Sequence, residues 1–192
     1  MFIVIDSGSV ADLRRGRHQL SFQAGMDDAA QRQDEFADAF ESAFARLRIR
    51  IETACAGEPD WPAGAVAGIQ AALEFAAGDP ASVRVLTTDA LAGGKAGFAC
   101  YGRMISYLGE LLLPGRAERP GGESLPAETE RALSGGIAML VAQRIDLDRA
   151  DELPELAAEA SQFVLTPYLG IAEARRVAAN LGQGWDGVRR RR

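Results

Sequence analysis

Residues 34–55, DEFADAFESAFARLRIRIETAC, carry the clearest structural pattern in the chain. Large apolar residues recur in this stretch at spacings of four and three, which place them on one face of an α-helix. These residues are Phe36, Phe40, Phe44, Leu47 and Ile51. Asp34 is a candidate N-cap, and Gly57 and Pro59 are typical of a helix end. The pattern predicts an amphipathic helix over 34–55.

The same apolar periodicity continues through the chain, interrupted by glycine and proline. It predicts further helices over 62–77, 80–91, 95–113, 124–145, 151–169 and 170–181. Because the connections are short and no later strand pattern follows, we expect an all-α fold, a helical bundle.

The two ends of the chain depart from this pattern. Residues 2–5, FIVI, are typical of a short strand, and Gly16 and Gly25 are expected to break any helix longer than Val10–Arg15. We therefore divide the chain into an irregular or strand-like N-terminal region (1–33), a helical domain (34–182) and a mobile basic tail (183–192).

Composition argues against several classes of function. The chain has 192 residues, a net charge of −6, one lysine, one histidine and two cysteines that form no CxxC pair. An acidic chain is a poor general binder of polyanions, and a lone His18 completes neither a metal site nor a catalytic triad. We expect no catalytic residues, no metal and no cofactor. Binding, rather than catalysis, is the expected function.

The sequence also indicates where the chain resides. No apolar run approaches the roughly 18 residues that a membrane span requires, and the N-terminus lacks the basic start of a signal peptide. Two cysteines without a disulfide pattern suit a reducing compartment. We expect a soluble, cytoplasmic protein.

One cluster of aromatic and soft side chains is a candidate ligand pocket. Such side chains beside Gly97, Ala99 and Gly102 can line an apolar pocket between helices, although ordinary core packing explains the same pattern. The candidate ligand-binding residues are Phe75, Phe98, Tyr101, Met104 and Tyr107.

Several phrases, in their order, resemble the TetR-like transcriptional regulators. These are DEFADAFESAFARL, LEFAAGDPASVRVL, a long helix ending in LLLPG, and LPELAAEASQFVLTPYLG, which together cover about residues 34–180. The resemblance implies an all-α homodimer in which the last two long helices form the dimer bundle. It also implies that the preceding helices enclose a pocket for a small-molecule effector.

The predicted dimer interface follows from this resemblance and from the apolar stripes of the two helices, where Gly135-Gly136 would permit a close approach. The expected interface residues are Leu133, Gly136, Ile137, Leu140, Leu156, Phe163 and Tyr168.

The resemblance implies that residues 1–33 are a degenerate or truncated DNA-binding region, and this leaves two hypotheses open. Residues 20–26, LSFQAGM, resemble the first helix and turn of a helix-turn-helix, but the following DDAAQ places acidic residues where DNA recognition needs basic ones. The chain is then either a homodimeric, DNA-binding regulator with an apolar effector, or a DNA-incompetent relative that binds a ligand or forms heterodimers.

Overall fold

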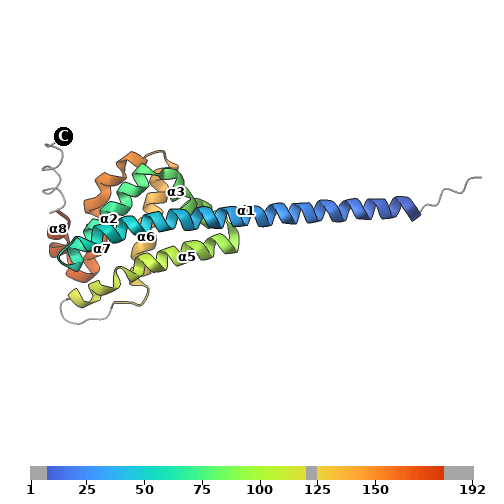
Figure 1. Ribbon diagram of the computed structural model, residues 1–192. Helices are drawn as coiled ribbons and strands as arrows, with labels where there is room; N and C mark the ends of the chain where they lie inside the picture. The colour runs from blue at the N-terminus through green and yellow to red at the C-terminus, as the bar shows by residue number, and fades with distance from the viewer. Residues whose placement is uncertain (1–7, 120–124, 180–192) are drawn as a thin grey trace, which may run out of the picture. The chain divides into compact units, whose positions relative to one another are not determined.

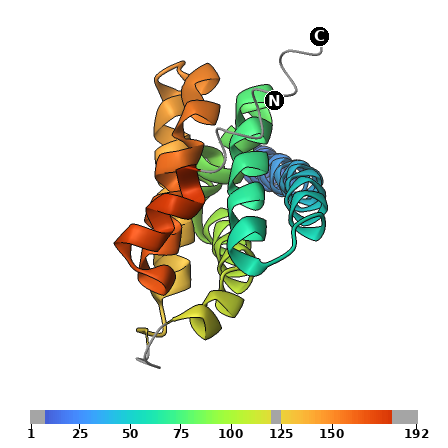
Figure 2. The same ribbon diagram turned by 90° about the vertical axis from the view of Figure 1, so that its left-hand side faces the viewer.

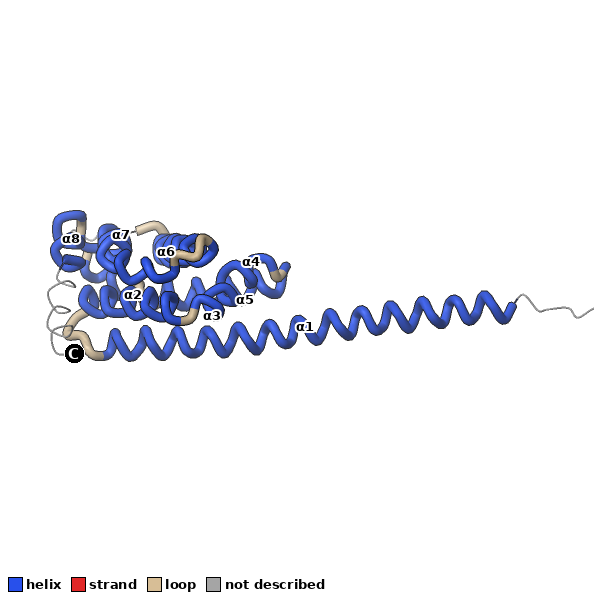
Figure 3. Tube along the Cα trace, turned by 90° about the horizontal axis from the view of Figure 1, so that it is seen from above, coloured by secondary structure: helices blue, strands red, loops and turns tan. Residues whose placement is uncertain are grey.

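The computed structural model describes the backbone of residues 8–119 and 125–179, with side chains from residue 31 onward. Within these ranges the chain consists of helices and loops, and it has no strand (Figure 3). The expectation of an all-α fold is confirmed. The predicted strand at 2–5 and the predicted tail at 183–192 lie outside the described residues.

The first helix is much longer than predicted. Helix α1 runs from Gly8 to Ala56 without interruption, a length of 49 residues. The predicted breaks at Gly16 and Gly25 are therefore wrong, and Asp34 lies inside the helix rather than at its N-cap. A glycine costs a helix about 1 kcal/mol, which a long run of helix-forming neighbours offsets. Residues 20–26 are helical throughout, so the expected turn is absent from this segment.

The chain divides into two units, residues 1–38 and residues 39–192, and α1 passes through the boundary. The second unit contains the remaining helices, labelled in Figure 1. They are α2 (Trp61–Gly78), α3 (Pro80–Arg84), the π-helical η1 (Val85–Asp89), α4 (Ala90–Ala92), α5 (Gly94–Glu110), the 3-10 helix η2 (Leu113–Glu118), α6 (Thr129–Asp146), the 3-10 helix η4 (Ala150–Leu156), α7 (Ala157–Leu169) and α8 (Ile171–Ala179).

Local capping explains why several predicted helices start where expected. The Asp60 carboxylate accepts a hydrogen bond from the Ala63 N–H at 2.9 Å and begins α2. Asp79 accepts one from the Ser82 N–H at 3.1 Å and begins α3. In both cases a proline follows the cap, where its missing N–H costs nothing.

Two other predicted helices are altered by contacts from elsewhere in the fold. Helix α6 begins at Thr129 rather than at residue 124, because Arg116 binds the carbonyls of Leu125 and Pro126 and holds them outside the helix. The predicted helix 151–169 begins as the 3-10 helix η4 and becomes α-helical only at Ala157.

The core of the second unit lies where α2, α6 and α7 meet. Figure 2 shows α2 between the C-terminal part of α1 and α7. One cluster joins Leu73 and Val83 to Val141 and Ile145, and a second surrounds Tyr168. Because α2 has neighbours on opposite sides, almost none of its residues is fully exposed.

Gly115 in η2 provides space for an aromatic side chain. A Cβ at this position would lie 2.2 Å from the Trp61 ring, far inside van der Waals contact. By contrast, a Cβ at Gly102 in α5 would meet no heavy atom within 4 Å. We therefore expect an added methyl group to be unfavourable at Gly115 and tolerated at Gly102.

We predict that Gly115→Ala lowers the free energy of unfolding by about 1–3 kcal/mol, because Trp61 must leave its position. The matched variant Gly102→Ala is expected to raise it by up to about 1 kcal/mol, since alanine favours a helix and meets open space. Urea titration followed by circular dichroism measures both. An unchanged Gly115→Ala protein would show that Trp61 moves without cost.

Candidate ligand cavity

The second unit contains a partly open cavity of about 340 Å³. Its walls come from α1, α2, α3, η1, α5, α6 and α7, with residues from Leu47 to Val164. Native interiors are close-packed, with few voids larger than a water molecule. A cavity of this size is therefore a feature that needs an explanation.

Small residues on α2 create much of the space. Gly64, Gly68, Ala72 and Ala76 lie four residues apart on the side of α2 that faces the cavity. A Cβ on Gly68 would lie 2.9 Å from the Cys55 Sγ, so this glycine also allows α1 to approach. The Cys55 thiol donates to the Gly64 carbonyl at 3.3 Å, and burial raises the pKa of this thiol.

The π-helical turn η1 contributes another wall through Leu86 and Thr87. Such turns are rare and often occur at functional sites. The Thr87 hydroxyl donates to the Val83 carbonyl at 2.7 Å, so it is already satisfied within its own helix. This wall therefore presents mainly apolar surface.

Trp61 lies at the start of α2 and lines the cavity. Its indole N–H donates to the Leu111 carbonyl at 3.2 Å. Its ring meets the Tyr168 ring edge to face, with centroids 5.0 Å apart and planes at 73°. The Trp61 ring thus has a defined orientation.

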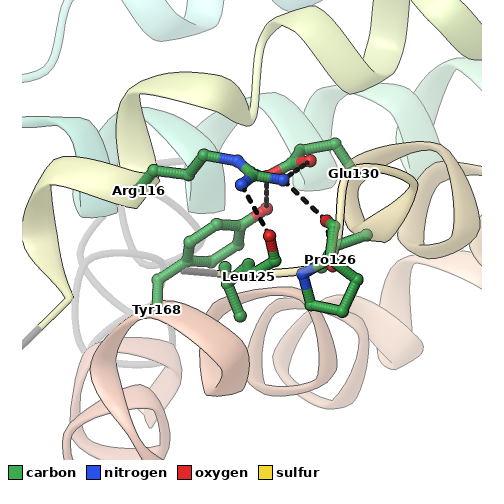
Figure 4. Close-up of polar contacts among 6 residues, drawn as sticks. Arg116, Leu125, Pro126, Glu130 and Tyr168 are labelled. Atoms are coloured by element: carbon green, nitrogen blue, oxygen red, sulfur yellow. Dashed lines mark hydrogen bonds and ion pairs between the residues drawn. The ribbon is translucent and has the colours of Figure 1, made fainter. Parts of the chain in front are cut away.

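A buried ion pair supports this arrangement (Figure 4). Glu130 of α6 is 3% exposed, and Arg116 of η2 binds its two oxygens at 2.8 and 2.7 Å. The Tyr168 hydroxyl also donates to Glu130, at 3.2 Å. Arg116 also donates to the carbonyls of Leu125 and Pro126, at 3.0 and 2.8 Å. One guanidinium therefore links η2, the start of α6 and, through Glu130, α7.

The protonation states fit these hydrogen bonds. Burial raises the pKa of Glu130, but the hydrogen bonds and charge of Arg116 outweigh burial, so this pKa lies below its usual range. Burial, followed by the Glu130 carboxylate, raises the pKa of Tyr168. At neutral pH Tyr168 is the donor and Glu130 the acceptor.

The structure places the predicted ligand-binding residues in different environments. Phe75 and Met104 line the cavity, whereas Phe98, Tyr101 and Tyr107 do not. Phe98 is 63% exposed, and Tyr101 is half-buried. The Tyr107 hydroxyl donates to Glu52 at 2.5 Å, and the Arg48 guanidinium lies 4.5 Å from the centre of its ring. Tyr107 therefore joins α5 to α1.

The predicted dimer-interface residues also differ in their burial. Leu133 and Tyr168 are buried within the chain's own core, and Ile137 lines the cavity. Gly136 and Phe163 are exposed neighbours, since a Cβ on Gly136 would lie 3.7 Å from the Phe163 ring. Leu140 and Leu156 are half-buried.

Sequence reasoning missed several lining residues, although two signals were present. The repeated small residues of α2 at a spacing of four indicate a close helix contact. Ser134 falls on the same helical face as Ile137 and Val141, where a polar residue is unexpected. Trp61 and Ile69 carry no such signal.

The described part of the chain has neither a metal-binding cluster nor a membrane-spanning helix. No group of three His, Cys, Asp or Glu side chains there is arranged to hold a metal ion. No helix there combines the length and the hydropathy that a membrane crossing requires.

We predict that Arg116→Met destabilises the protein at neutral pH, because Glu130 stays buried without its cation. The loss should shrink as the pH falls toward 4.5, the ordinary value for Glu. Over that range the wild type begins to lose the stability that its lowered Glu130 pKa provides, while the variant gains by protonating Glu130.

Urea titrations at several pH values test this, with Arg131→Met as the control. Arg131 pairs with Glu128 at the surface, at 3.6 Å, and its removal should change little at any pH. A loss in Arg116→Met that is independent of pH would instead assign the effect to lost packing.

Comparison with protein-family models, with curated proteins and with solved structures finds no match to this chain.

Proposed function

We propose that this chain binds a small, apolar molecule in its helical cavity. The observation that carries the proposal is the cavity of about 340 Å³, whose lining is predominantly aliphatic and aromatic. Small-molecule sites are typically cavities of roughly this size with a few polar groups. Ile69, Phe75 and Val141 are representative of the apolar surface that a ligand would meet.

Energetics support a bound occupant. The cavity is partly open, so its apolar wall is exposed to water when no ligand is bound. Burial of apolar surface is favourable by roughly 25 cal/mol per Å². A ligand that fills the cavity would cover this wall, which is a driving force for binding.

Of the two hypotheses about DNA, the structure favours the DNA-incompetent relative of the TetR-like regulators. Helix α1 is continuous over residues 20–26, so the described part of this region offers no helix-turn-helix. The DNA-binding regulator would require duplex binding that weakens steeply with salt. Two free thiols, Cys55 and Cys100, suit the proposed cytoplasmic location.

Uptake of the neutral dye N-phenyl-1-naphthylamine tests the proposal through its fluorescence. We expect saturable binding to the wild type and at least a tenfold loss in Ala138→Leu, because Ala138 lines the cavity and leucine would fill it. Its unfolding free energy should not fall, since the added side chain enters open space.

The matched control is Ala45→Leu, at an exposed position of α1. It should bind the dye as the wild type does. No saturable uptake by the wild type, or an equal loss in both variants, would contradict binding in this cavity.

We also propose that the chain forms a homodimer through the outer faces of α6 and α7. Met139 and Phe163 are each 53% exposed, and Gly136 lies beside Phe163. Large apolar side chains that stay exposed on neighbouring helices can mark an interface. The TetR-like resemblance names the same pair of helices.

Light scattering at micromolar concentration should report a dimer for the wild type and a monomer for Phe163→Glu, because a charge in the interface is left without a partner. Ile171→Glu is the matched control, at an exposed apolar position of α8. A monomeric wild type contradicts the proposal, as does a Phe163→Glu protein that remains dimeric.

A further inference from the structure

Most hydrogen-bond donors in the cavity wall are already used by the protein. The Trp61 N–H donates to the Leu111 carbonyl, the Cys55 thiol to the Gly64 carbonyl, and the Thr87 hydroxyl to the Val83 carbonyl. These three groups therefore offer no free hydrogen to a ligand.

Ser134 differs from them. It lies on α6 in the cavity wall and is 7% exposed, yet the structure gives its hydroxyl no hydrogen bond among the described residues. A helical serine or threonine commonly donates to the carbonyl four residues earlier, as Thr87 does. The Ser134 hydroxyl is not among the fully buried polar atoms that lack a partner, which fits a hydroxyl that is accessible from the cavity. The Ser134 hydroxyl is thus a donor that a ligand can satisfy.

Charge in the wall excludes some ligands. The lining residues include no lysine or arginine, and the one acidic residue among them is Asp60, at the exposed start of α2. The Asp60 carboxylate already caps that helix through the Ala63 N–H. An anion in this cavity would lose its hydration without gaining a counter-charge.

The size of the cavity sets the scale of the ligand. At roughly 30 Å³ per water in the liquid, the volume corresponds to about 11 waters. A compact skeleton of about one or two fused rings fits such a space.

We infer that the ligand is an uncharged, mainly apolar molecule with a single hydrogen-bond-accepting oxygen, such as a ketone. This oxygen accepts a hydrogen bond from the Ser134 hydroxyl. This inference rests on the proposed function, since it assigns a chemical class to the occupant of the same cavity. Ser134 then selects among apolar molecules of similar shape, because only one with an acceptor can receive a hydrogen bond from this hydroxyl.

The test compares two probes of nearly equal shape, 2-acetonaphthone and 2-ethylnaphthalene, which differ in the carbonyl oxygen. Each displaces N-phenyl-1-naphthylamine from the full-length wild type and from Ser134→Ala. We expect Ser134→Ala to weaken the ketone about tenfold, or about 1.4 kcal/mol, and the hydrocarbon less than twofold. The control Ser106→Ala, on α5 and outside the cavity wall, should leave both unchanged.

The outcomes separate this inference from the proposed function. Equal weakening of both probes by Ser134→Ala, or no weakening of either, would overturn the role of Ser134 while cavity binding stands. Displacement by 2-naphthoate as effective as by the ketone would overturn the assignment of an uncharged ligand. If neither the dye nor either naphthalene binds the wild type, the proposed function fails together with the inference.

Discussion

Glu130 is an ionised carboxylate at almost complete burial, and a charge at such depth is stable only with a partner. Arg116 meets this requirement and also binds the backbone where α6 begins. Tyr168 adds a third donor from α7, and its ring supports Trp61 at the cavity. The cavity wall at Trp61 thus depends on a polar network that does not itself touch a ligand.

The cavity lowers the stability of the fold, because its walls lack packing contacts. Small residues along α2, such as Gly68 and Ala72, forgo packing contacts that larger side chains would make. Under the proposed function, a ligand would restore these contacts only in the folded state. At a concentration one hundred times its Kd, such a ligand would raise the unfolding free energy by about 2.7 kcal/mol. The proposal therefore links stability to occupancy of the cavity.

Helix α6 has two distinct apolar surfaces. Ser134, Ile137 and Ala138 line the cavity, whereas Met139 is exposed and Gly136 lies beside the α7 side chain Phe163. The sequence shows one broad apolar stripe here, which we interpreted as a single dimer interface. The stripe is wide because α6 packs on its own chain and also presents apolar side chains outward. Periodicity counts apolar positions but does not say which neighbour each one meets.

The all-α class and the starts of α2 and α3 could be predicted from the sequence, because periodicity, aspartate caps and prolines act within a few residues of chain. The sequence also indicated two cavity residues, Phe75 and Met104. Three features could be seen only in the folded chain: the late start of α6, the close approach of α1 to Gly68, and the position of Ser134 in the cavity wall. Each of these depends on atoms that folding brings together from distant helices. A local sequence pattern does not predict which distant residues will meet.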